Sequence, residues 1–204
     1  MTGATPNATF SSAYAGSVEY YAAMTRFGSV AVDPDEPVGH RAWIHSHCRI
    51  IGPNGPQTLA IPIEKSSLAP GATVRHLRIA EHAGWRRVHW GALFSAYGKT
   101  PFFEHVAPDL LRLYERGDKW LIDFNMSLHE LVVDFLDLPI TTRGGTGGVD
   151  MRHRVGEKEQ NGYRSAEYWQ IWAGRHGFVP GLSILDLLMN TGREAILTLT
   201  AATS

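Results

Sequence analysis

The sequence predicts an α+β (mixed α/β) fold, in which a small N-terminal sheet with a hairpin packs against a predominantly helical C-terminal half. Two observations lead to this class. Short β-prone runs separated by turn residues fill positions 29–79, whereas long segments with apolar residues at helical spacing follow from Trp85. Hydrophobic residues make up 44% and charged residues 19% of the 204 positions, which is typical of a folded chain with a sizeable core.

The N-terminal half should contain one helix and several short strands. Residues 1–13 are small and polar and predict a flexible tail, so that one domain spans residues 14–204. Val18, Tyr21 and Ala22 recur at helical spacing and predict a helix over 16–27. Asn54-Gly55 between β-prone runs is a strong hairpin signal. The expected strands are 29–33, 43–51, 57–63 and 73–79.

The C-terminal half should be mostly helical. In the longest helix, Leu121, Asn125 and Leu128 share one face, so the polar Asn125 interrupts an apolar stripe. Glycines at 144–148 open a segment, 143–160, that we expect to be mobile, because it lacks the residues of a phosphate-binding loop. The expected helices are 84–98, 102–116, 119–137, 166–176 and 184–190.

The stretch from Phe178 to Gly192 carries the signals of a complete helix. Ser183 can cap its first turn, and Asp186 three residues later completes a capping box. Gly192 can end the helix. Asp186 and Asn190 therefore either hold a helix or line a site, and the spacing favours the helix.

Composition excludes several functions. A formal net charge of −1, with both signs interleaved, provides no basic surface for nucleic acid or for an anionic membrane. We find no apolar run near the ~20 residues of a membrane span and no signal-peptide pattern, so we expect a cytoplasmic protein. The single cysteine, Cys48, excludes an intrachain disulfide and a cysteine-rich zinc site. We expect no cofactor.

Four blocks of the sequence, taken in order along the chain, form a pattern that can be compared with known families. They are residues 13–21, the strand-turn-strand unit 47–63, the block 85–125, and the closing stretch 178–192. With them the chain resembles the WbqC-like protein family from about Tyr14 to Leu199. It departs from the family at Ser46-His47, where Asn-Arg is usual, so a role of that arginine does not transfer to His47.

The resemblance implies a role in surface-polysaccharide or other natural-product biosynthesis, with a glycine-transferase role in O-antigen assembly as the leading suggestion. We therefore expect a transferase that moves an acyl or aminoacyl (glycyl-type) group from an activated or carrier-bound donor to an amine or hydroxyl. The expected partners are a sugar or small-molecule acceptor and an acyl or peptidyl carrier protein. The alternatives are a non-catalytic accessory protein that binds a ligand or partner, and a thioesterase-like hydrolase.

Cys48 and His89 are the candidate catalytic residues. A thiol near a base can carry an acyl group, because the base raises the thiolate fraction. His47 faces away from Cys48 on an alternating strand, so His89 is the better-placed base. The alternative is that Cys48 and His89 are buried core residues. The candidate substrate-binding residues are Tyr14, His47, Tyr97, Asn125 and Arg152.

His45 and His47 would share one face of an extended strand and could together bind a metal ion. A catalytic site would need a third donor, such as His76 or Asp33, and the sequence lacks any familiar metal-ligand spacing. Ordinary histidines are the favoured interpretation, and we expect no metal site.

Overall fold

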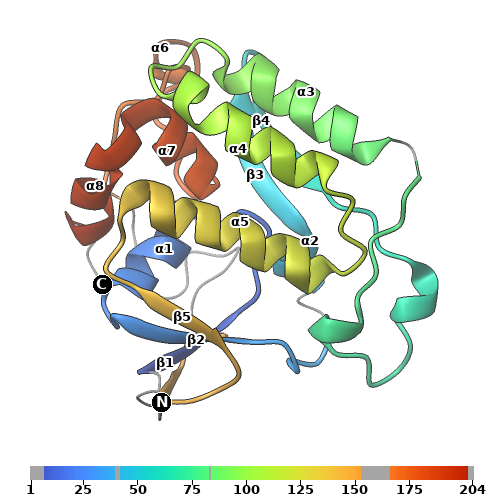
Figure 1. Cartoon of the computed structure of the whole chain (residues 1–204). Coiled ribbons are helices and arrows are strands. Elements are labelled where there is room, and N and C mark those ends of the chain that lie inside the picture. The colour runs from blue at the N-terminus through green and yellow to red at the C-terminus, as the bar shows by residue number, and fades with distance from the viewer. Residues whose placement is uncertain (1–6, 40–41, 83, 153–165, 202–204) are drawn as a thin grey trace.

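The computed structural model describes residues 7–39, 42–82, 84–152 and 166–201, and it has the mixed α/β architecture that the sequence predicts. Four parallel strands form one sheet in the order β5-β2-β1-β6 (Figure 1). An antiparallel hairpin forms a second sheet. The strands are β1 (Ala8–Ser11), β2 (Ser29–Asp33), β3 (His47–Gly52), β4 (Gly55–Ala60), β5 (Thr141–Gly144) and β6 (Val149–Asp150).

β1 and β2 form the buried centre of the parallel sheet. Every residue of β1 is buried, and Ala8 pairs with Val30 on one side and with Val149 on the other. Strands covered on both faces consist of near-continuous apolar residues rather than an alternating pattern. The run Val30-Ala31-Val32 has this character and is correctly assigned from the sequence as a strand over 29–33.

Two helices pack side by side against this sheet. α1 (Val18–Thr25) connects β1 to β2, and α5 (Leu121–Leu136) precedes β5. The ring of Tyr21 in α1 stacks on that of His129 in α5 at 5.6 Å, and His129 Nε2 lies 2.8 Å from Thr142 Oγ1 of β5. Right-handed crossovers in one direction place successive helices on the same face of a sheet, which explains this arrangement.

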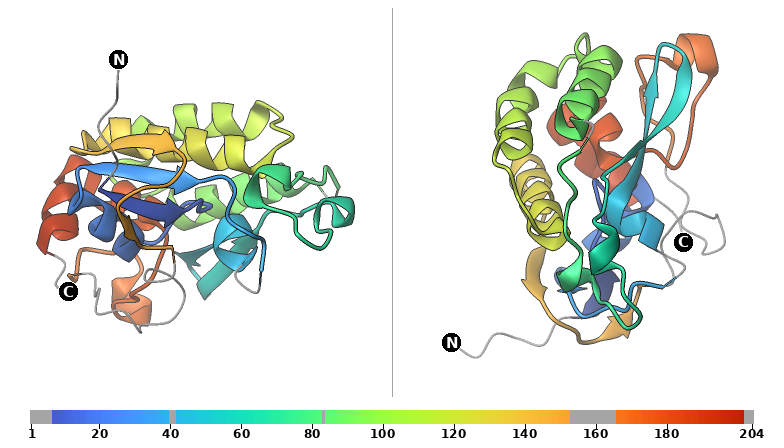
Figure 2. Two further views of the ribbon diagram at one scale, coloured as in Figure 1. Left: turned by 90° about the horizontal axis from the view of Figure 1, so that it is seen from below. Right: turned by 90° about the vertical axis from the view of Figure 1, so that its right-hand side faces the viewer.

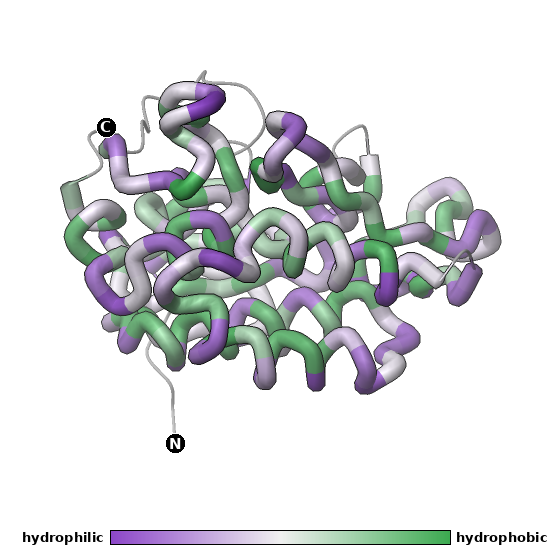
Figure 3. The backbone as a smooth tube through the Cα atoms, turned by 90° about the horizontal axis from the view of Figure 1, so that it is seen from above, coloured by the Kyte–Doolittle hydropathy of each residue, from purple (hydrophilic) through white to green (hydrophobic). Residues whose placement is uncertain are grey.

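α3 (Trp85–Tyr97), α4 (Phe103–Glu115) and α5 form a layer over the hairpin, as Figures 1 and 2 show. Their amphipathic patterns appear as alternating colours along the tube in Figure 3. In α4, for example, Phe103, Val106 and Leu110 are buried whereas Glu104 is exposed. The sequence predicts these three helices to within two residues at each end.

The C-terminal helices close the core. α7 (Ile184–Thr191) is buried over nearly its whole surface and contacts α1, α3, α4, α5 and β3. Gly192 follows it at φ +58°, where a Cβ would overlap the Phe102 ring, so glycine is required there. The remaining helices are α2 (Ala42–Ser46), α6 (Ala173–His176) and α8 (Ala195–Ala201), with 3₁₀ turns η1 (Lys65–Ser67), η2 (Val74–His76) and η3 (Gly192–Glu194).

Several sequence-based assignments were wrong. Residues 8–11 form the central strand β1 and not part of a flexible tail, because they find a partner strand on each side. Residues 42–46 form α2, so only the end of the strand expected over 43–51 is present. Residues 74–76 form a 3₁₀ turn instead of a strand, and the helix expected over 166–176 begins only at Ala173.

The segment expected to be mobile, 143–160, lies only partly within the described residues. Its first part contributes the end of β5 and all of β6, whereas residues 153–160 lie outside the described ranges. None of the helices in the described ranges combines the length and apolar character that crossing a membrane requires.

Candidate functional site

The loop that follows β1 connects the polar groups of the interior. It begins at Ser11 and leads to the N-cap of α1, Ser17. Ala15 in this loop has φ +44°, a left-handed conformation that is strained for a residue with a side chain. From this loop Ser11, Ser12 and Tyr14 reach three different polar groups, which are described next.

Tyr14 lies at the centre of a buried aromatic and polar cluster, which we call the Tyr14 cluster: Tyr14, Cys48, His89 and Tyr114. The hydroxyl of Tyr14 lies 2.9 Å from His89 Nδ1 and 2.5 Å from the hydroxyl of Tyr114. All four residues are at most 4% exposed. The structure therefore brings Tyr14, Cys48 and His89 together, although they come from a loop, a strand and a helix.

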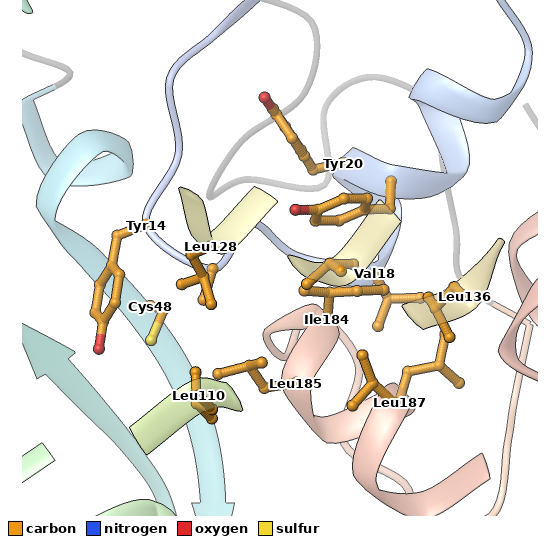
Figure 4. Close-up of a cluster of buried hydrophobic side chains, with 14 of the residues drawn as sticks. Tyr14, Val18, Tyr20, Cys48, Leu110, Leu128, Leu136, Ile184, Leu185 and Leu187 are labelled. Atoms are coloured by element: carbon orange, nitrogen blue, oxygen red, sulfur yellow. The ribbon is translucent and has the colours of Figure 1, made fainter. Parts of the chain in front are cut away.

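Cys48 contacts the core on β3, next to the Tyr14 ring and near Leu110 and Leu128 (Figure 4). Burial raises the pKa of the Cys48 thiol well above its usual value, and a hydrogen bond with Tyr14 offsets only part of this rise. A thiol with a raised pKa is protonated at neutral pH and is a poor nucleophile. Burial and protonation both weigh against Cys48 as the attacking group.

His89 is engaged at both ring nitrogens. Its Nδ1 faces Tyr14, and the ring also hydrogen-bonds the backbone carbonyl of Ala60. Burial lowers the pKa of His89 to about 4, with the charge of nearby His47 acting in the same direction. The imidazole is therefore neutral at pH 7, donating to Ala60 and accepting from Tyr14. A histidine held in this way fixes the positions of its neighbours.

Asn125 hydrogen-bonds the same loop at Ser12, two residues before Tyr14. Its side-chain amide donates to Ser12 Oγ at 3.0 Å and to the backbone oxygen of His45 at 2.8 Å. Asn125 Oδ1 has no hydrogen-bond partner among the described residues, and Asn125 borders a small hollow of about 10 Å³ together with Tyr20, Tyr21 and others. The amide is thus used mainly to hold the loop and α2 against α5.

Ser11 belongs to a charged group of residues at the carboxyl ends of the strands. We call this group the carboxyl edge; it consists of Ser11, Asp33, Glu36, Asp150 and Arg152. Ser11 Oγ donates to Glu36 Oε1 at 3.0 Å. Arg152 Nη1 lies 2.5 Å from Asp33, and its Nη2 lies 2.7 Å from Asp150. Asp33 and Glu36 are both 4% exposed, whereas the Asp150 side chain is 48% exposed. Solvent thus reaches part of this edge.

The carboxyl edge lies where the strand order reverses direction. The chain runs from β1 outward to β2 and β5, and then returns to place β6 on the opposite side of β1. In sheets of parallel strands, ligands bind beyond the carboxyl ends at such a switch point. Arg152, which the sequence suggests as a substrate-binding residue, is paired in the structure with the carboxylates of Asp33 and Asp150.

A second buried cluster, the Asp186 cluster, consists of Tyr97, Tyr168, Gln170, Asp186 and Asn190. Tyr168 donates to Asp186 Oδ2 at 2.7 Å, whereas Oδ1 receives no hydrogen bond of acceptable geometry from the described residues. Burial raises the pKa of Asp186 to about 6, and the polar side chains around it oppose the rise. Tyr97 belongs to this cluster, so the structure separates it from Tyr14, Cys48 and His89.

The capping box expected at α7 is therefore wrong. Ser183 does cap the helix, because its hydroxyl accepts from Leu185 N at 3.2 Å. Its own backbone N–H, however, donates to the carbonyl of Arg49 at 2.7 Å, and Asp186 turns instead toward Tyr168. Asn190 Oδ1 accepts from Ile171 N at 3.0 Å, so both polar residues of the motif hold the segment around 168–171.

The two neighbouring histidines lie in different surroundings. His45 is in α2, not on the expected strand, and its Nδ1 is 2.7 Å from the Ser12 carbonyl. His47 begins β3 and stacks on Trp43 at 5.3 Å. Within the described residues, no group of three or more potential ligands is arranged to hold a metal ion.

Sequence reasoning missed Ser11, Glu36, Tyr114 and Tyr168. The first two could have been found only by recognising β1 as a strand, since Ser11 is its last residue and Glu36 follows β2. Tyr114 has a detectable signal, because it shares the apolar face of α4 with Leu110 and Val106. A tyrosine on such a face needs a buried partner for its hydroxyl.

This architecture defines a mixed α/β protein whose polar groups meet at the carboxyl edge of a parallel sheet. A model of the WbqC-like protein family matches residues 12–147 and 157–198. The chain therefore belongs to the WbqC-like protein family, as the sequence resemblance predicts. No curated protein and no solved structure matches the chain significantly.

Proposed function

We propose that this protein is a biosynthetic transferase that moves an acyl or aminoacyl group directly from an activated or carrier-bound donor to an amine on a sugar or small metabolite. The single observation that carries the proposal is the carboxyl edge at the switch point of the sheet, where the carboxylates of Asp33 and Asp150 bind the Arg152 guanidinium and a third carboxylate, Glu36, accepts a hydrogen bond from Ser11. Membership of the WbqC-like family supports a role in biosynthesis.

An amine acceptor fits this charge distribution. Among the described residues, the two carboxylates bound to Arg152 already compensate its charge, so the edge attracts a cation rather than an anion. A carboxylate can also take the proton that an ammonium loses before it attacks. The amine nitrogen then bonds to the acyl carbon, the bond from that carbon to the donor's sulfur or oxygen breaks, and the leaving group takes up a proton.

In this proposal the Tyr14 cluster positions the loop rather than forming a covalent intermediate. Tyr14, His89 and Asn125 hold the loop that carries Ser11, and Cys48 stays a thiol. A route through an acyl-Cys48 thioester would need the sulfur to become accessible and to lose its proton. Direct transfer needs neither change.

The test is an assay of the full chain with carrier protein loaded with glycyl or acetyl thioester and with glucosamine as the acceptor. We expect mass spectrometry to show acyl-glucosamine and unmodified protein, with glucose a far poorer acceptor. Asp150→Asn should lower the rate on the order of a hundredfold, whereas Asp134→Asn, an exposed change on α5, should not. An adduct on Cys48, or a full rate with Asp150→Asn, would contradict the proposal.

A second candidate is a non-catalytic binding protein of a biosynthetic cluster. The observation in its favour is that the thiol and imidazole are both engaged inside the protein. In the same assay it predicts a reversible complex with acceptor or carrier and no product. Release of free glycine or acetate without transfer would instead identify a hydrolase.

A further inference from the structure

A hollow of about 400 Å³ opens in the long connection between β4 and α3. This connection is the segment at the right-hand side of Figure 1. The volume falls in the range of small-molecule sites. It is lined by Ser66, Ser67, Ala69, Pro70, Gly71, Ala72, His76, Arg78 and Trp120.

The walls of this hollow are held in place by backbone hydrogen bonds. Ile79 N donates to Lys119 O, and Leu121 N donates to Leu77 O, so the segments bearing Arg78 and Trp120 are fastened together. Ser67 Oγ donates to the Glu64 carbonyl and accepts from Arg78 N, which fixes the turn on the other side. The hollow is therefore a preformed feature of the fold.

Two kinds of recognition group meet there. Trp120 is 36% exposed and offers a large apolar ring surface. Arg78 has its guanidinium over that indole at 5.2 Å and binds Glu64 through Nε at 3.3 Å, which leaves its terminal N–H groups without a hydrogen bond among the described residues. His76 Nδ1 contacts Thr73, and its Nε2 makes no hydrogen bond within the same ranges.

We infer that this hollow binds a sugar ring that carries a carboxylate or phosphate group. The C–H face of the ring packs on Trp120, the anionic group meets the terminal N–H groups of Arg78 and the ring of His76, and Ser66 is placed to bond a sugar hydroxyl. Guanidinium N–H groups are well suited to both anions because they match their geometry.

Backbone hydrogen bonds connect the segment that lines the hollow with the loop that leaves β2. Between the lining residues Ala72 and His76, Val74 N donates to Glu36 O at 3.0 Å and Arg75 N donates to Pro34 O at 2.8 Å. Glu36 of the carboxyl edge lies on that loop, and Asp33 directly precedes the loop as the last residue of β2. A ring held at Trp120 would thus be the acceptor of the proposed function, and only this last step depends on that proposal.

Binding is tested by calorimetry with two anionic sugars, glucosamine 6-phosphate and glucuronic acid. Glucose, which has the ring without the anion, and inorganic phosphate, which is the anion without the ring, are the comparison ligands. We expect both anionic sugars to bind more tightly than either comparison ligand. Trp120→Ala should weaken all sugar binding about tenfold, whereas Trp169→Ala, a change at a more exposed tryptophan elsewhere, should not. Arg78→Gln should abolish the preference for anionic sugars, with Arg112→Gln as the matched control.

Equal affinities for the anionic sugars and glucose, or unchanged binding by Trp120→Ala, would overturn the inference. These measurements need no donor, so they separate the two proposals. Binding at Trp120 without acyl transfer would refute the proposed function alone. Transfer to glucosamine that is unaffected by Trp120→Ala would refute the acceptor role of the hollow.

Discussion

The Tyr14 cluster and the Asp186 cluster are both buried groups of tyrosines and other titratable side chains, yet they differ in charge. In the Tyr14 cluster every polar group is neutral at pH 7, and His89 is bonded at both nitrogens. In the Asp186 cluster a carboxyl group is buried with one oxygen unsatisfied and a pKa near 6. Burying a charge costs far more than burying a bonded neutral group.

The comparison indicates different tasks for the two clusters. A neutral, fully bonded network stabilises its surroundings and holds one arrangement of the loop after β1. A buried carboxyl group of raised pKa makes the packing of α7 against residues 168–171 dependent on pH. The predictions below test this distinction in order of decreasing expected effect.

Tyr14→Ala should lower the free energy of unfolding by about 4 kcal/mol, because it removes a buried ring and leaves His89 Nδ1 and the Tyr114 hydroxyl unpaired. Tyr14→Phe keeps the ring and should lower it by about 2 kcal/mol. Urea denaturation measures both. If Tyr14→Phe left stability unchanged, the hydrogen bonds of this cluster would not be stabilising.

Asp186→Asn should remove a pH dependence of stability. The pKa of Asp186 is raised from 3.8 to about 6 in the folded protein, so its contribution is fully present below about pH 4 and is lost as pH rises through 6. The loss is about 3 kcal/mol for this shift. Thermal or urea unfolding of the wild type should show this decline between pH 4 and 8, and Asp186→Asn should flatten it.

Two variants serve as controls for that experiment. Asp134→Asn changes an exposed carboxylate and should leave the pH profile of stability as in the wild type. Tyr168→Phe removes a donor to the carboxylate, so it should steepen the decline above pH 6. A wild-type profile that is flat between pH 4 and 8 would show that Asp186 is ionised without difficulty.

Cys48→Ala should have the smallest effect, a loss of about 1 kcal/mol of stability for one buried sulfur. Acyl transfer should keep most of its rate. The native thiol should also react with a disulfide reagent far more slowly than the thiol of protein unfolded in urea, since it is buried and protonated. Rapid labelling of the native protein would reinstate Cys48 as a candidate nucleophile.

The sequence predicted the regular parts of this fold well. α3, α4 and α5 repeat apolar residues over three or more turns, and the centre of β2, residues 30–32, is an apolar run, so local pattern determines them. β1 was not predicted, because four residues are too few to show a periodic pattern. Its stability comes from partner strands that pair with it at positions 30 and 149. Residues 73–79 were β-prone, but residues 74–76 form a 3₁₀ turn, because tertiary contacts override propensity.

The candidate site was predicted only in part, because it too depends on tertiary contacts that no local pattern shows. Tyr14, Cys48 and His89 were chosen from their residue types, and they do meet, but composition cannot reveal that they meet in the interior. The Asp186 side chain fits a capping box by spacing alone. Only its burial against Tyr97 and Tyr168 shows where it points. The carboxyl edge depends on strand order, which no local pattern encodes.

The central position of β1 also has a consequence for synthesis of the protein. Ala8 and Thr9 leave the ribosome well before their second partner strand, which begins only at Val149. Until that residue has emerged, one edge of β1 exposes open N–H and C=O groups that could pair with another chain. Pairing over so long a stretch also slows folding. Nascent chains that stop before Val149 should therefore be aggregation-prone and should depend on chaperones more than the full chain does.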